Sequence, residues 1–233
     1  NVTIVDGYEG KSNDGGVTVI AVNPGINSPV NPLAVRQRVY QAQLLDPRHV
    51  EQFTDSPSKS SNYGVTNTST IDLGDVTIKN IFSYRNIDSD DTADAALPFN
   101  ALIQRVIVSA EQFTNELQFS GSLLDDKLDF IAGGYFFWED ATSTTLNTVF
   151  GSPITISPRT RAKNESKSLF AQFDYKLGGG FSVTAGARYT IDDRFVHQFS
   201  QSSPTTVALD VVATRTFKKP TWTLSLNYKP SED

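Results

Sequence analysis

The feature that most constrains this chain is a strict alternation of apolar and polar residues, repeated in pairs of segments joined by very short turns. In residues 111–123 the odd positions include Phe113 and Leu117. The even positions of the same segment include Glu116 and Gln118. A period of two residues is typical of a β-strand with one apolar and one polar face. The chain is therefore predicted to be all-β and to consist of antiparallel hairpins.

The same unit recurs over residues 60–233. Seven alternating segments are predicted to be strands, at 62–72, 76–87, 111–123, 128–139, 168–177, 181–192 and 221–228, and residues 1–5 could add an eighth. Short turns are expected at 73–75, 124–127, 178–180 and 229–233, and long polar loops at 88–110, 141–165 and 197–214. Short turns at one end and long loops at the other are typical of outer-membrane barrels, whose turns are periplasmic and whose loops are extracellular.

The first 59 residues do not follow this plan. Dipeptides with Pro and Gly, such as those in Asn23-Pro24-Gly25, mark irregular chain. The mixed spacing of apolar residues between Leu33 and Leu45 indicates a short helix at 33–45. We expect residues 6–59 to form one long extracellular loop that contains this helix.

Composition excludes several classes of function. The chain has 20 Lys plus Arg against 26 Asp plus Glu, a net charge of −6, so no basic field would attract nucleic acid. It has no Cys and two His, which excludes disulfides, thiolate zinc sites and three-His metal sites. No segment approaches the roughly 18 consecutive apolar residues of a membrane-spanning helix. No cofactor is indicated.

The alternation alone permits two architectures. A soluble, secreted β-sandwich, acting as a binding or adhesion module, and a membrane barrel with a wet lumen both use strands with one apolar and one polar face. Segments of 11–13 residues and aromatic residues near strand ends favour the barrel, because a strand that crosses a bilayer needs about 9–11 residues. In a barrel the polar face lines the lumen, and the residues expected there include Glu116, Gln118, Gln172, Asp174, Arg188 and Thr223.

The number of strands indicates a section of a larger barrel. Barrels must close, because unpaired backbone at a sheet edge is costly in lipid. Seven or eight strands with long excursions fit a portion of a larger transmembrane β-barrel of the antiparallel up-and-down type. A small closed barrel is the alternative.

Five segments carry a family resemblance. TNELQFSGSL at 114–123 and LDFIAGGYFFWED at 128–140 resemble a mid-barrel hairpin of TonB-dependent outer-membrane receptors. VTIKNIFSYR at 76–85, FSVTAGARYT at 181–190 and PTWTLSLNYKP at 220–230 are similar to other barrel segments of that family, in the same order. The resemblance covers residues 60–233.

This resemblance implies a 22-stranded barrel with an N-terminal plug, in the outer membrane of a Gram-negative bacterium. It implies uptake of a scarce nutrient, such as a ferric siderophore, vitamin B12 or a saccharide, with energy from TonB. It also implies contact with lipid and lipopolysaccharide. The segments resemble only a middle section of such a receptor, since the sequence shows no plug, no TonB box and no terminal aromatic strand.

The densest basic stretch contains Arg159 and Arg161, with Lys163 and Lys167 nearby. Guanidinium groups bind anionic oxygens bidentately, so these residues could hold a ferric siderophore or contact lipopolysaccharide phosphates at the barrel rim. The simpler interpretation is a solvated loop.

The loop expected at 88–110 contains a cluster of aspartates. Ca²⁺ favours several carboxylates in a flexible loop, but the cluster lacks the Gly and the distal Glu of an EF-hand. A solvated extracellular loop explains the same residues. The weak calcium candidates are Asp88, Asp90, Asp91 and Asp94.

His197 is a third ligand-binding candidate, and it follows Asp192 and Asp193. A small barrel enzyme could use such an Asp and His pair for hydrolysis. No Gly-x-Ser-x-Gly motif occurs, and a single loop His is usually only polar. We therefore expect no enzymatic activity.

Overall fold

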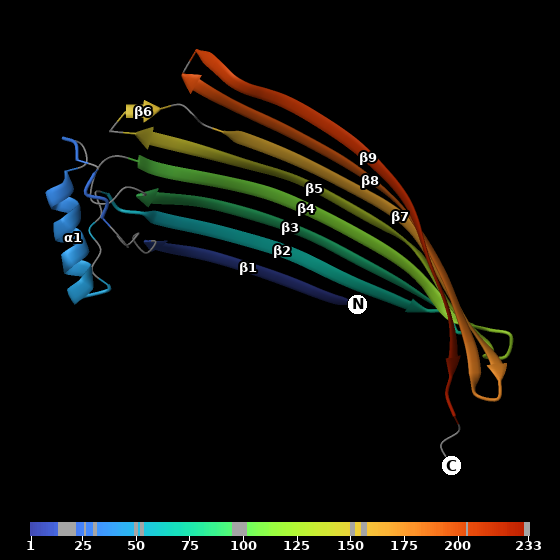
Figure 1. The fold of residues 1–233 in the computed structure, drawn as a ribbon. Coiled ribbons are helices and arrows are strands. Elements are labelled where there is room, and N and C mark those ends of the chain that lie inside the picture. Colours follow the sequence, from blue (N-terminus) through green and yellow to red (C-terminus); the bar gives the residue numbers. More distant parts are fainter. Residues whose placement is uncertain are drawn as a thin grey trace.

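A computed structural model describes residues 1–13, 22–25, 27–29, 32–48, 51, 54–94, 102–149, 152–154, 158–203 and 205–230. All strands in these ranges belong to one curved antiparallel sheet (Figure 1). The two packed sheets of a sandwich are therefore not formed by the described residues.

The sheet has nine strands, of which eight are long, and each long strand pairs with the next long strand along the chain. The order is β1-β2-β3-β4-β5-β7-β8-β9, and the short strand β6 pairs only with β5. This up-and-down order confirms the predicted fold class, a portion of an antiparallel barrel. The bounds are β1 (Val2–Asn13), β2 (Pro57–Asp72), β3 (Val76–Asp94), β4 (Leu102–Leu123), β5 (Leu128–Val149), β6 (Ser152–Ile154), β7 (Arg159–Gly178), β8 (Phe181–Ser203) and β9 (Thr206–Tyr228).

Tight turns gather at one end of the sheet, which we call the turn end (Figure 1). The turn between β4 and β5 has three residues with positive φ, namely 58° at Leu124, 53° at Asp125 and 62° at Asp126. Asp tolerates this left-handed conformation better than most residues. Three glycines with φ of 92°, 60° and 81° connect β7 to β8 at 178–180. The opposite end, near the helix α1 (Leu33–Leu45), is called the loop end.

The strands are longer than the alternation predicts, so the structure differs from the expected loops at 88–110, 141–165 and 197–214. Strand pairing continues through most of these ranges, as between β8 and β9 up to the pair Ser203 and Thr206. The residues at 95–101, 150–151, 155–157 and 204 lie outside the described residues. Backbone hydrogen bonds extend each hairpin beyond the apolar band, where no lipid imposes alternation on the side chains.

The N-terminal region differs in the same way. β1 continues past residue 5 to Asn13, which lies opposite Pro57 at the start of β2. The irregular region is therefore shorter than the predicted 6–59, and it contains α1. The Arg38 guanidinium on this helix binds both oxygens of Glu51, at 2.6 and 2.7 Å. In the described ranges, no helix has the length and apolar character needed to cross a membrane.

One face of the sheet is apolar and lacks cover. Its large side chains are highly exposed, with relative exposures of 72% at Leu169, 80% at Trp222 and 67% at Leu224. Among the described residues, Val39 on α1 is the only fully buried hydrophobic one. A sheet of this size with no packed core needs another apolar phase against its apolar face, and lipid supplies one.

Candidate binding face of the sheet

The other face of the sheet, called the polar face, carries the polar side chains of successive strands. Gln118 on β4 lies opposite Gly133 on β5, and this row continues through Phe170 and Arg188 to Thr221 on β9. Directly opposite residues share a face. The register places all of the residues that alternation assigned to a lumen on the polar face, namely Glu116, Gln118, Gln172, Asp174, Arg188 and Thr223.

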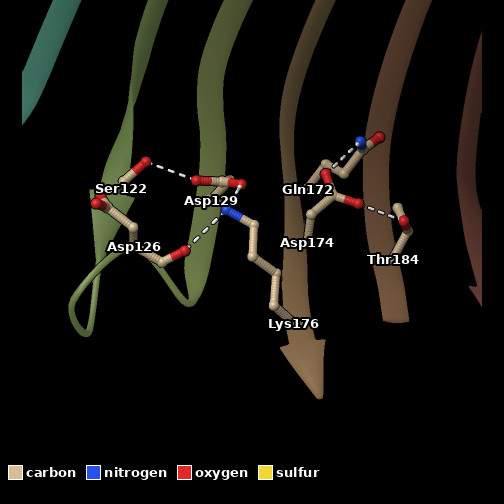
Figure 2. Close-up of polar contacts among 7 residues, drawn as sticks. All are labelled: Ser122, Asp126, Asp129, Gln172, Asp174, Lys176 and Thr184. Atoms are coloured by element: carbon tan, nitrogen blue, oxygen red, sulfur yellow. Dashed lines mark hydrogen bonds and ion pairs between the residues drawn. The ribbon is translucent and has the colours of Figure 1, made fainter. Parts of the chain in front are cut away.

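A hydrogen-bonded network occupies the turn end of the polar face (Figure 2). Ser122 Oγ donates to Asp129 Oδ1 at 2.5 Å. Lys176 Nζ lies 3.0 Å from Asp129 Oδ2 and donates to the carbonyl oxygen of Asp126 at 2.8 Å. Lys176 thereby connects β7 to the turn that precedes β5.

A second hydrogen-bonded group lies beside the first, on the last strands of the sheet. Gln172 Nε2 donates to Asp174 Oδ2 at 3.2 Å, and Thr184 Oγ1 donates to Asp174 Oδ1 (Figure 2). Asn227 Nδ2 on β9 donates to Thr184 Oγ1 at 3.1 Å. These groups satisfy one another across β7, β8 and β9, so the turn end is a stabilised structure with its polar groups already engaged.

Above this network the polar face is hollowed around Gly186, which has no side chain. The hollow has a volume of about 390 Å³ and is lined by Phe170, Gln172 and Arg188, among others. The guanidinium carbon of Arg188 lies 5.8 Å from the ring centroid of Phe170 and 5.6 Å from that of Tyr135. These distances are within cation–π range. The hollow therefore combines a cation with aromatic surface.

The basic candidates Arg159 and Arg161 lie on the other side of the sheet. Both share the face of Leu169, because they are separated from it by even numbers of residues on β7. Arg161 Nε and Nη2 donate to the two carboxylate oxygens of Asp140 at 2.9 and 2.6 Å. These hydrogen bonds lower the pKa of the Asp140 carboxyl from its usual value. The basic stretch thus lies at the loop end of the apolar face.

His197 also lies on that face, opposite Arg161. Its Nε2 is 2.8 Å from Asp210 Oδ1. Asp193 instead accepts a hydrogen bond from Thr216, and Asp192 lies on the polar face. The structure therefore does not join His197 to either of the aspartates considered for hydrolysis.

The four aspartates considered for calcium do not converge. Asp90 is bound by the guanidinium of Arg105, whose hydrogen bonds lower the pKa of the Asp90 carboxyl. Asp91 accepts a hydrogen bond from Ser58 at 2.5 Å. Asp88 is paired in the sheet with Ser109, and Asp94 is 1% exposed at the end of β3. In the part of the chain that the structure describes, no three His, Asp or Glu side chains lie close enough together to hold a metal ion.

Two cations that sequence reasoning missed lie side by side on the polar face. Arg194 on β8 is directly opposite Arg215 on β9. Arg194 is on the predicted strand that precedes His197, but Arg215 lies before the strand predicted at 221–228, so the alternation does not place the two opposite each other. Continuing the alternation of Thr221 and Thr223 backwards in steps of two would have reached Arg215.

The sequence matches the profile of the family described as TonB dependent receptor-like, beta-barrel, over residues 6–233. A search of the curated proteins finds no match. Among solved structures, the ferric yersiniabactin uptake receptor FyuA from Yersinia pestis is similar in fold, with a TM-score of 0.66 and 14% identity. The alignment covers 77% of this chain and 27% of FyuA.

Two further receptors are similar in fold. The ferric-catecholate import receptor Fiu from E. coli K12, in its open form, has a TM-score of 0.54 and 13% identity, and 76% of this chain covers 34% of Fiu. The siderophore receptor PiuA from Acinetobacter baumannii has a TM-score of 0.51 and 14% identity, and 76% of this chain covers 31% of PiuA. The chain therefore spans 27% to 34% of the length of these solved proteins.

Proposed function

Because the chain belongs to the family of TonB dependent receptor-like β-barrels, we propose that it forms part of the wall of an outer-membrane receptor that takes up a scarce nutrient into a Gram-negative cell. TonB supplies the energy in the whole receptor. A ferric siderophore is the first choice of nutrient, since FyuA, Fiu and PiuA are named as siderophore or ferric-catecholate receptors. Vitamin B12 and saccharides are the alternatives.

The observation that carries the proposal is the division of one sheet into two faces. The apolar face exposes side chains such as Leu169 and Trp222, and lipid covers them in a barrel. The polar face carries the hollow at Gly186 and lines the lumen. Binding and transport along this wall, without catalysis, is the function that we assign to these residues.

The loop end of the apolar face suits contact with the membrane surface. Arg159 and Arg161 lie beyond Trp138, where the apolar face gives way to charged residues. The guanidinium of Arg159, and that of Arg161 beyond the two nitrogens that bind Asp140, are placed at this height to meet phosphates of lipopolysaccharide. Because Arg159 and Arg161 lie on the face opposite the lumen, their position supports lipopolysaccharide as their partner and not a nutrient in the lumen.

The proposal is tested by deleting the gene for the full-length protein in its source bacterium. Under iron limitation, cells are given radioactive iron bound to a catecholate, a hydroxamate or a phenolate siderophore. We expect the deletion to abolish uptake of one class, and the complete gene to restore it. Collapse of the proton gradient should stop the restored uptake.

Vitamin B12 and maltodextrin uptake, measured in the same strains, separate the alternative nutrients. The intact mass of the detergent-extracted receptor should be several times the 25.5 kDa of this chain. Absence of the protein from the outer-membrane fraction would contradict the proposal. Unchanged uptake of every nutrient would do the same.

A further inference from the structure

The polar face of β8 and β9 is strongly basic, although the whole chain has a net charge of −6. The alternation and register place four cations on this part of the face: Arg188, Arg194, Arg215 and Lys219. The only carboxylate on the polar face of these two strands is Asp192. We call the four cations the basic strip.

The polar face of the preceding strands has the opposite charge. On β4, β5 and β7 it carries four carboxylates and one cation, which are Glu116, Asp129, Glu139, Asp174 and Lys176. Lys176 is paired with Asp129, and Glu139 accepts a hydrogen bond from Asn164 at 2.7 Å. The basic strip is therefore a local feature of β8 and β9.

The guanidinium carbon of Arg215 lies 4.8 Å from the ring centroid of Phe217, but this contact leaves the repulsion between Arg194 and Arg215 in place. Like charges directly opposite each other on two strands are destabilising. Within the described ranges, none of the four cations of the basic strip forms an ion pair with a carboxylate, although other strand arginines do, as Arg85 does with Asp6 at 2.8 Å. An anionic group placed between two adjacent guanidinium groups would reverse this repulsion.

The strip runs from the row where the apolar band ends towards the turn end. Arg194 and Arg215 lie one row beyond Trp138 and its neighbours, where the apolar band ends. Arg188 lies six residues deeper on β8, about 20 Å at a rise of about 3.3 Å per residue. There it lines the hollow at Gly186 and contacts the Phe170 ring.

We propose that the basic strip binds a small solute with two or more anionic oxygen groups, carboxylate or phosphate, as it enters from the loop end. Arg194 and Arg215 hold the solute first, and Arg188 in the hollow forms the second position. This inference rests on the proposed function, because it names the charge of the solute that the barrel admits. A cationic wall also raises the local concentration of anions and speeds their capture.

The test uses the full-length receptor in detergent, with citrate and inorganic phosphate as probes and glucose as a neutral control. Binding is measured by titration calorimetry at about 20 mM and at about 500 mM salt. We expect citrate to bind the native receptor at low salt and to bind more weakly at high salt. In the double variant R194Q/R215Q, its Kd should rise at least tenfold, since each lost charge-assisted hydrogen bond weakens binding severalfold or more.

Two neighbouring lysines supply a matched control. Lys219→Gln removes a charge from the polar face, opposite Thr190, and Lys218→Gln removes the same charge from the apolar face, opposite Ile191. We expect weaker citrate binding in K219Q and native binding in K218Q. Heat-modifiable migration on gels verifies that each variant is folded.

Three results would overturn the inference. One is equal citrate binding by the native receptor and R194Q/R215Q, and another is equal weakening in K218Q and K219Q. The third is no citrate or phosphate binding by the native receptor, together with a lower unfolding temperature of R194Q/R215Q, which would mean that carboxylates elsewhere in the barrel already neutralise the strip. Energised nutrient uptake alongside any of these results would leave the proposed function intact.

Discussion

Two adjacent glycines on β5 have very different surroundings. Gly133 lies on the polar face beneath the ring of Phe170, and Gly134 lies on the apolar face. A Cβ at Gly133 would be 2.7 Å from Phe170 Cζ and still closer to the carbonyl oxygen of Leu117. The backbone oxygen cannot move without disturbing the β4–β5 pairing. Gly133→Ala should therefore lower the free energy of unfolding by about 1–3 kcal/mol, as overpacking does.

Gly134→Ala is the matched control for this prediction. A Cβ there would meet Leu169 Cδ2 at 3.4 Å, an ordinary contact distance. Its effect should stay within about 0.5 kcal/mol. Urea unfolding of both variants of the full receptor in detergent measures the difference. Equal stability of the two variants would show that the Phe170 ring and the Leu117 carbonyl do not constrain this position.

At the scale of elements, the β5–β7 hairpin is held beyond the apolar band by the ion pair between Asp140 and Arg161. The pair lowers the pKa of Asp140 in the folded state. Its stabilisation is therefore present above the unfolded-state pKa of about 3.9 and is lost as the pH falls through the lower folded-state value. Asp140→Asn should speed amide hydrogen exchange in this part of the hairpin a few-fold at pH 7. It should have little effect below the folded-state pKa of Asp140, where the carboxyl is protonated and the ion pair is already lost.

Glu111→Gln is the control for the same hairpin. Glu111 lies directly opposite Asp140 on the same face, so removing its charge relieves a repulsion between carboxylates. Exchange in E111Q should be equal to that of the native protein or slower. If D140N and E111Q exchanged alike at pH 7, the ion pair would not be what stabilises the hairpin extension. High salt should reduce the difference between them.

The strands were predictable from the sequence only where their side chains alternate. The alternation in segments such as 128–139 and 181–192 predicts strands, their faces and the turns between them, because lipid on one side and water on the other impose it. Beyond Trp138, both faces of a hairpin meet water, and residues such as Thr142 and Thr144 follow no period of two. The strand extensions were therefore predicted as loops.

The residues of the polar face were likewise predictable only within the alternating segments. Gln172, Asp174 and Arg188 lie within alternating segments, and the two-residue period of a strand is enough to place them on the polar face. Arg215 lies before the predicted start of its strand, and its position opposite Arg194 depends on the register of β8 against β9. The register between two strands cannot be predicted from the sequence of either strand alone.

At the scale of the whole molecule, the sheet has two edges, the outer sides of β1 and β9, which no described strand covers. Unpaired backbone at a sheet edge is costly in lipid and invites association in water. We expect the 233-residue chain, expressed by itself and refolded in detergent, to form mixed oligomers, whereas the full receptor gives one species. Size-exclusion chromatography with light scattering measures this. A monodisperse, heat-modifiable monomer of 25.5 kDa would instead indicate a small closed barrel.

In the proposed receptor, whose loop end faces the outside of the cell, the long hairpins determine which surface an antibody can reach. β8 and β9 each have 23 residues, about 75 Å of strand at about 3.3 Å per residue, whereas a bilayer crossing uses only about 9–11. In the proposed barrel, more than half of each strand therefore extends beyond the bilayer as a continuation of the sheet. An antibody would recognise side chains brought together from two or three strands, so epitopes here are conformational. Linear peptides copied from one strand would be poor immunogens for the native receptor.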